Sequence, residues 1–138
     1  MDKALNYLAL ARKGGMAPLG EEPVGAITRT GKGYLVVVAG DASDHTWRRS
    51  KSFVAGTEQQ CIRLPFTKEE LGFAVGRSSL AIAALTDAAL ALAFVKALPE
   101  PEKYKAAAEV LEEKVKKQRQ RQSEAKAHQR NVRKGKKK

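Results

Sequence analysis

The sequence has 138 residues, of which 43% are hydrophobic and 30% are charged, and this composition suits one domain with a real core plus an extension. The single cysteine, Cys61, excludes an internal disulfide and any cysteine-based metal cluster. The net charge is +11, and it lies at one end of the sequence. Residues 1–113 hold 14 basic and 14 acidic side chains, whereas residues 114–138 hold 12 basic ones and one acid, Glu124. A neutral globule with a basic tail indicates a polyanionic partner.

The beginning of the chain predicts two helices separated by an extended segment. Lys3–Lys13 carries apolar residues at helical spacing and is followed by two glycines. Asn6 breaks its apolar stretch, so we interpret it as an amphipathic helix rather than a secretion signal. Residues 16–19 form an edge-like extended piece, because Pro18 cannot donate a backbone hydrogen bond. Residues 20–30 then open with two acids and a proline, which suit the start of a helix.

Strands and helices alternate after this point. Residues 34–39 are an unbroken apolar run, typical of a strand that is covered on both faces. Thr67 and Glu70 form a capping box, a pattern that opens a helix. The predicted elements after the first strand are a helix from 43 or 44 to about 55, a strand at 60–64, a helix at 67–75, a loop at 76–79, a strand at 80–85 and a helix from 87 to about 98.

This alternation predicts an α/β fold, a three-layer α/β/α sandwich with a mixed four-stranded sheet, in residues 1–98. Residues 99–138 form a basic C-terminal extension, in which we expect a helix to about Lys117 that frays into a disordered tail. The most apolar stretch, residues 80–98, is interrupted by Thr86 and Asp87. We therefore predict a buried strand and helix there instead of a membrane span, and a soluble, cytoplasmic protein.

Four stretches of the sequence, taken in order, resemble a known family. They are residues 8–15 (LALARKGG), 20–22 (GEE), 35–43 (LVVVAGDAS) and 68–76 (KEELGFAVG). In this order and spacing they resemble the L-seven-Ae-type ribosomal proteins, and most closely the small bacterial branch of ribosomal-protein-like RNA-binding proteins. The resemblance covers residues 1 to 98 and leaves the basic tail outside it.

The resemblance implies a three-layer α/β/α fold and recognition of kink-turn RNA, a bent duplex that contains sheared G·A pairs. In that family a Gly-x-Asn-Glu sequence at a helix start reads guanines, a lysine one turn later assists, and the loop before the last strand covers an exposed base. Gly20 and Glu22 match the glycine and the glutamate, whereas Glu21 stands in place of the asparagine and Gly25 in place of the lysine. The loop corresponds to Gly76, Arg77, Ser78 and Ser79.

The chemistry of these residue types assigns roles to them. The Glu22 carboxylate can accept two hydrogen bonds from the N1–H and N2–H edge of a guanine, whereas Glu21 cannot donate as an asparagine does. Phosphate contacts dominate the affinity of proteins for nucleic acids, and cations supply them. The candidate phosphate contacts are Arg12, Lys13 and Arg77 in the globule and Lys116, Lys117, Arg119, Arg121, Arg130, Arg133 and Lys134 in the tail.

These observations predict an RNA-binding ribosomal or ribosome-associated protein, expected to be a monomer. Its expected partner is ribosomal RNA or another structured RNA, with ribosomal proteins as further candidates. A second interpretation is a protein-interaction adaptor whose tail attracts polyanions non-specifically. We expect no enzyme, cofactor or metal, because the sequence contains no phosphate-binding loop, dinucleotide fingerprint, nucleophile elbow or metal-ligand spacing.

Overall fold

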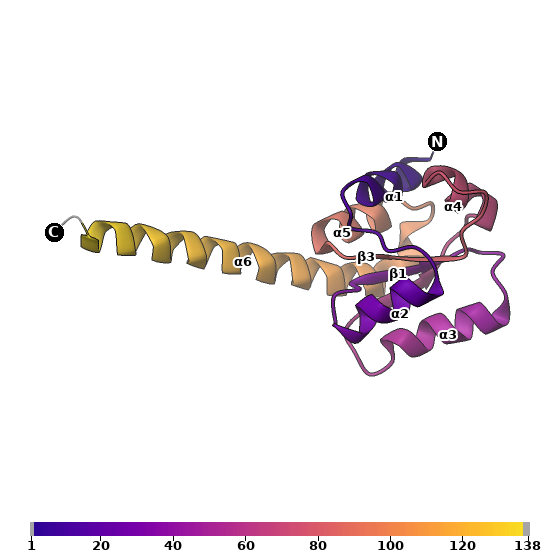
Figure 1. The fold of residues 1–138 in the computed structure, drawn as a ribbon, viewed down its shortest axis with the longest axis horizontal. Helices are drawn as coiled ribbons and strands as arrows, with labels where there is room; N and C mark the ends of the chain where they lie inside the picture. The colour runs from indigo at the N-terminus through magenta and orange to yellow at the C-terminus, as the bar shows by residue number, and fades with distance from the viewer. Residues whose placement is uncertain (1, 137–138) are drawn as a thin grey trace.

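The centre of the fold is strand β1 (Leu35–Val38), in which every side chain is buried. β2 (Gln60–Arg63) pairs with β1 in parallel, and β3 (Ile82–Leu85) pairs with its other edge in antiparallel orientation. Helices cover both faces of this sheet, which explains why β1 is apolar without alternation. The computed structural model describes the backbone of residues 2–136 and the side chains of residues 2–127 (Figure 1).

Helices lie on both sides of the sheet in Figure 1. The α-helices are α1 (Lys3–Lys13), α2 (Glu21–Arg29), α3 (Asp44–Val54), α4 (Lys68–Ala74), α5 (Ala88–Lys96) and α6 (Lys105–Lys136), and a short 3-10 helix, η1 (Pro101–Tyr104), precedes α6. α2 and α3 pack against each other on one side, while α1, α4 and α5 lie on the other. The first turns of α6 pack against α5 and β2. Within the residues that the structure describes, no helix is long and apolar enough to cross a membrane.

Local sequence signals account for most helix starts. The Thr67 hydroxyl accepts a hydrogen bond from the Glu70 N–H at 3.1 Å, and the Glu70 carboxylate accepts one from the Thr67 N–H at 3.0 Å. The capping box predicted at the start of α4 is therefore confirmed. The Asp87 carboxylate likewise accepts a hydrogen bond from the Leu90 N–H at 2.8 Å and begins α5.

The predicted α/β class is confirmed, but the predicted four-stranded sheet is wrong, because the sheet has three strands in the order β2-β1-β3. Residues 16–19, the predicted edge strand, form only an isolated bridge, between Leu19 and Ala83 of β3. Pro18 has no N–H to return to β3, and the Met16 N–H donates to the Ala11 carbonyl instead, so the ladder along this edge is incomplete. Three backbone hydrogen bonds nevertheless hold the segment beside β3: Gly20 N–H to the Ile82 carbonyl at 2.9 Å, Ala84 N–H to the Pro18 carbonyl at 3.0 Å and Thr86 N–H to the Met16 carbonyl at 2.9 Å.

The predicted end of the last helix is also wrong, since α6 continues past Lys117 to Lys136. Its first turns bury Ala107, Leu111 and Val115 against the rest of the fold. All side chains of residues 119–127 are exposed, so packing does not hold this part of the helix. Residues 105–134 contain no glycine or proline and are rich in lysine, arginine, glutamine and alanine. These residues favour a helix intrinsically, which explains the continuation.

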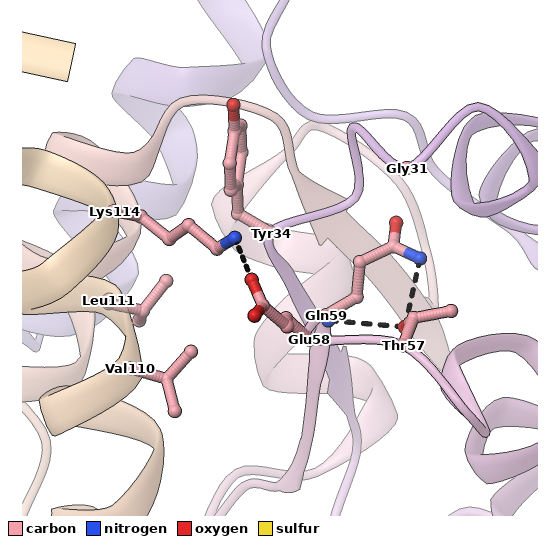
Figure 2. A pocket seen from close by; sticks show the side chains of 8 residues that line it. All are labelled: Gly31, Tyr34, Thr57, Glu58, Gln59, Val110, Leu111 and Lys114. Carbon is pink, nitrogen blue, oxygen red and sulfur yellow. Dashed lines mark hydrogen bonds and ion pairs between the residues drawn. The ribbon is translucent and has the colours of Figure 1, made fainter. Parts of the chain in front are cut away.

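A cavity of about 200 Å³ lies where α6 meets the start of the sheet (Figure 2). Within it the Lys114 ammonium group pairs with the Glu58 carboxylate. The hydrogen bond and charge of Lys114, with a further contribution from the charge of Lys117, lower the pKa of Glu58. One turn beyond Lys114, the Gln118 amide donates to the Tyr34 hydroxyl at 3.3 Å. These contacts fix the point at which α6 leaves the globule, beside the starts of β1 and β2.

Candidate nucleic-acid interface

The antiparallel pairing of β1 and β3 gives the sheet two distinct ends. Val38 of β1 pairs with Ile82 at the start of β3, and Leu35 pairs with Leu85 at the end of β3. We call the first end, at Val38 and Ile82, the loop end. α6 leaves the globule at the second end, at Leu35 and Leu85, so we call residues 116–136 of α6 the arm and this second end the arm end. Strands rise about 3.4 Å per residue, so the two ends of β3 lie roughly 10 Å apart.

The start of α2 lies at the loop end. Gly20 precedes α2 with a φ of 92°, a backbone conformation that glycine adopts at little cost. Its N–H donates to the carbonyl of Ile82, the first residue of β3, at 2.9 Å. Glu21 and Glu22 follow in the first turn of α2, where the positive end of the helix dipole favours carboxylates. Glu22 is exposed and available to a ligand.

Residues 76–79 reach the loop end from α4. The Arg77 N–H donates to the Gly72 carbonyl at 2.8 Å, which folds the loop back over the helix. A Cβ at Gly72 would lie 2.7 Å from the backbone N and Cα of Ser79, so this close approach requires glycine. All four residues of the loop are exposed, and β3 begins three residues after Ser79. The structure thus brings together the two predicted base-contacting segments, residues 20–22 and 76–79, at one end of the sheet.

Arg49 also belongs to this surface, although the sequence analysis did not select it. Arg49 Nε, from α3, lies 3.5 Å from Glu21 Oε1, and its guanidinium stacks 5.5 Å from the centre of the Phe53 ring. Both charged side chains are about half exposed, so the ion pair contributes at most about 1 kcal/mol to stability. Its effect on the site is electrostatic, because it partly neutralises Glu21. No local pattern could have revealed it, since Glu21 and Arg49 lie on different helices.

A hollow of about 390 Å³ separates α2 from α3 beside these residues. Gly25 is buried under α3 here, and a Cβ at this position would lie 3.2 Å from two atoms of the Phe53 ring. A lysine at position 25 would therefore displace Phe53. The hollow contains hydrogen-bond acceptors and donors side by side, as the polar edge of a nucleobase requires. Its lining residues are Glu21, Glu22, Gly25, Ala26, Arg29, Arg49 and Phe53.

The other predicted contacts do not join the loop end. Arg12 and Lys13 are exposed in the last turn of α1. Three residues after Lys13, the Met16 carbonyl accepts a hydrogen bond from the Thr86 N–H, so this part of the chain lies at the arm end. Lys116 is also exposed and lies 3.5 Å from Glu113. The next three predicted arm cations are exposed near the point where α6 leaves the globule, and they are Lys117, Arg119 and Arg121. The side chains of three further predicted contacts lie outside the described part of the chain, and they are Arg130, Arg133 and Lys134.

Known structures contain this fold. No family model matches the sequence, and no curated protein matches it. The structure is similar to that of a Bacillus halodurans protein of unknown function, with a TM-score of 0.62 and 24% identity over 68% of this chain and 98% of that one. It is also similar to a Giardia lamblia 15.5-kD RNA-binding protein, with a TM-score of 0.54 and 20% identity over 75% of this chain and 85% of that one. The protein therefore has the α/β fold of these two proteins.

Proposed function

We propose that this chain is an RNA-binding protein of the L-seven-Ae type, which acts in the cytoplasm as a ribosomal or ribosome-associated protein and not as an enzyme. The loop end reads a folded, kink-turn-like RNA. Glu22 accepts hydrogen bonds from a guanine edge, and residues 76–79 cover a neighbouring base. The cations of α6 hold phosphates, and the protein acts as a monomer without a cofactor.

One observation supports this proposal most: residues 20–22 and 76–79, which are far apart in the sequence, both lie at the loop end of the sheet, near the start of β3. Glu22 and Ser78 are both exposed there, so neither contributes to the core. The backbone of each segment is fixed, by the Gly20 bond to Ile82 and by the Arg77 bond to Gly72. A surface of fixed backbone and free polar side chains is suited to reading bases. The similar fold of the Giardia protein, which is named for RNA binding, supports the same function.

The electrostatics of the hollow also support it. The family that the sequence resembles has a lysine where this chain has Gly25, and a glycine there removes a cation. Arg49 returns a cation to the same surface from α3, at 3.5 Å from Glu21. A guanidinium beside a carboxylate reduces the repulsion that Glu21 would exert on an RNA phosphate.

The proposal is tested by measuring the affinity of the chain for two RNA duplexes of equal length. One duplex is bent by G·A pairs, and the other is plain. We expect the full chain to prefer the bent duplex at physiological salt. Glu22→Gln should weaken binding to the bent duplex by roughly tenfold, because a hydrogen bond to a charged group is worth about 1.5–3 kcal/mol. Binding to the plain duplex should not change.

Glu109→Gln is the matched control, because Glu109 is an exposed glutamate on α6, away from the loop end. It should bind both duplexes as the unmodified chain does. Equal affinity of the unmodified chain for the two duplexes would contradict the proposed reading of RNA shape.

One observation favours the second candidate function, a protein-interaction adaptor. Phe73 on α4 is 75% exposed and lines a groove of about 350 Å³ together with Asp2, Leu5, Glu69 and Glu70. An apolar floor with carboxylates around it suits a basic segment of another protein that presents an apolar side chain. In that case neutralising the arm cations should abolish all RNA binding. Glu22→Gln and Arg77→Ala should then have no effect on any RNA.

A further inference from the structure

Charge is distributed unevenly between the two ends of the sheet. The loop end carries carboxylates after β1 and in the first turns of α2, α3 and α4. These are Asp41, Glu21, Glu22, Asp44, Glu69 and Glu70. The cations there are fewer, and one of them, Arg49, already faces Glu21. A phosphate that approaches the loop end therefore meets these carboxylates as well as cations such as Lys68 and Arg77.

The arm end, in contrast, carries more exposed cations than acids. Arg12, Lys13 and Lys32 are exposed at the arm end, and the exposed cations at the root of the arm follow on α6. Lys32 lies two residues before Tyr34, whose hydroxyl accepts the hydrogen bond from Gln118 of α6, so it is close to that root. Acids at this end already have partners: Glu58 is paired with Lys114, Glu113 lies 3.5 Å from Lys116, and Asp87 accepts the Leu90 N–H.

The two ends point away from each other. In Figure 1, α6 leaves the globule on the side opposite the start of α2 and α4. From Gln118 to Lys136 the helix extends about 27 Å further, at 1.5 Å per residue. The length of β3 adds roughly 10 Å between the two surfaces. A nucleotide bound against Glu22 and Ser78 is therefore separated from the root of the arm by roughly the 10 Å length of β3, and by more from the cations further along the arm.

We propose that the arm end is a second RNA-binding surface, which holds the phosphate backbone of an RNA segment separate from the one at the loop end. It consists of Arg12, Lys13 and Lys32 with Lys116, Lys117, Arg119 and Arg121. The proposal rests on the proposed function, because it assumes that the loop end reads RNA. Specificity then comes from the loop end, and most of the affinity comes from the arm end.

The chemistry of the arm end favours a phosphate backbone over bases. Its exposed side chains are flexible cations, and Tyr34, the aromatic residue beside the root of the arm, is half-buried with its hydroxyl bonded to Gln118. Nucleic acids carry phosphates at regular intervals along the strand, so one strand can contact cations that lie apart on α1, in the turn at Lys32 and on α6. The RNA ligand must therefore extend beyond the segment that the loop end reads.

Tethered cleavage of the RNA tests this directly. In full-length chains that carry Cys61→Ala, a hydroxyl-radical probe is attached at Pro65→Cys, two residues after β2, for the loop end or at Gln120→Cys for the arm end. Both positions are exposed, and neither is one of the proposed cations. The RNA is a bent, G·A-containing duplex with long flanking helices. We expect the two probes to cleave two segments that do not overlap.

The other outcomes separate the two proposals. Cleavage of the same nucleotides from both probes, or cleavage from Pro65→Cys alone, would overturn the second surface and leave the proposed function standing. Cleavage from Gln120→Cys alone would support the arm-end surface and overturn the reading of RNA at the loop end. An RNA that is neither bound nor cleaved would overturn both.

A charge variant gives an independent measurement. Arg12→Gln, Lys13→Gln and Lys32→Gln together should lower affinity for the long RNA by tenfold or more. They should also reduce the slope of log K against log salt by about 2–3, because each lost phosphate contact removes about 0.7–0.9. A short RNA that covers only the loop end should bind as before. An equal loss on both RNAs would overturn the proposal.

The matched control removes three exposed cations from other surfaces, through Lys3→Gln, Lys103→Gln and Lys105→Gln. It changes the net charge of the protein by the same amount as the triple variant. We expect it to leave the difference between long and short RNA unchanged. If the control and the arm-end variant behave alike, only net charge matters and the surface is not specific.

Discussion

Single residues at the loop end act through contacts that their own sequence positions do not reveal. Gly25 is buried beneath the Phe53 ring, and a side chain there would collide with it. Arg49 of the same helix as Phe53 lies against Glu21. The character of the candidate site thus depends on two pairs of residues that face each other across α2 and α3, and Arg49 and Phe53 of α3 lie outside the motif that the sequence analysis selected.

Cys61 gives a prediction at this scale. Burial raises the pKa of the Cys61 thiol from an ordinary 9.0 to about 12, although the charge of Lys51 acts in the opposite direction. Above pH 9 the unfolded chain loses this proton while the folded chain keeps it. The stabilising contribution is therefore complete below about pH 9 and is lost as the pH rises towards 12.

Urea unfolding between pH 8 and pH 11 measures this effect. Above pH 9, the unmodified chain should lose up to about 1.4 kcal/mol of unfolding free energy per pH unit more than Cys61→Ala does. The variant serves as the reference, because every other titrating group is common to both proteins. Parallel pH profiles for the two chains would show that the thiol does not contribute.

At the scale of elements, two junctions position the candidate site and the arm. Residues 76–79 fold back over α4 because Gly72 leaves room for the backbone of Ser79. The first turns of α6 join the core through Ala107, Leu111 and Val115, all of which are buried. The residues that begin the basic extension thus pack with the domain, while the cations that follow project from it.

Gly72→Ala tests the first junction. The new methyl group would lie 2.7 Å from the backbone of Ser79, and a backbone cannot rotate away as a side chain can. We expect a loss of about 1–3 kcal/mol of unfolding free energy and a weaker preference for the bent duplex. Ser79→Ala, which removes a hydroxyl and keeps the backbone, should change the free energy by less than about 0.5 kcal/mol. An unchanged stability of Gly72→Ala would show that the loop can move aside.

Leu111→Ala tests the second junction. Leu111 is 1% exposed, so truncation leaves a cavity between α6 and the sheet and should cost about 2–5 kcal/mol. Gln120→Ala, on the exposed part of the same helix, is the matched control and should be nearly neutral. Chemical denaturation measures both. A neutral Leu111→Ala would mean that the start of α6 is a tail and not a part of the domain.

At the scale of the whole molecule, the important property is the separation of charge. Residues 1–113 have no net charge, and residues 114–138 carry the whole +11. The fold places residues 114–136 on a helix that leaves the arm end, away from the carboxylates of the loop end (Figure 1). If the chain binds RNA as proposed, long-range attraction should orient an approaching RNA with its backbone towards the arm before the loop end makes contact.

The salt dependence of RNA binding tests this view. Lys116→Gln, Lys117→Gln, Arg119→Gln and Arg121→Gln together should lower the slope of log K against log salt by about 3, since each phosphate contact contributes about 0.7–0.9. Glutamine preserves the helix, so the loss would be one of charge. Gln120→Ala with Gln122→Ala is the control on the same stretch and should keep the original slope. An unchanged slope in the charge variant would show that these cations do not contact phosphates.

Much of the fold could be predicted because its signals are local. The helix Lys3–Lys13 and the capping box of Thr67 and Glu70 depend on neighbouring residues, and both are found as predicted. Pro18 indicated a weak edge strand at residues 16–19, but the reduction to one bridge depends on hydrogen bonds with β3, which lies far along the chain, so the sequence did not show it. For the candidate site, residues 20–22 and 76–79 could be selected from sequence, but Arg49 could not, because its contact with Glu21 crosses two helices.

The sequence by itself determined where helices begin, which strand is buried and where the charge lies, since each of these depends on the order of nearby residues. Only the tertiary structure decided which of these features face one another. The antiparallel pairing of β1 with β3 brings residues 20–22 and 76–79 to one end of the sheet. The packing of α6 along α5 and β2 carries the basic arm out at the other end. The physical reason is that hydrogen bonding and core packing join residues that are distant in the chain, and these long-range contacts alone set the direction in which each element points.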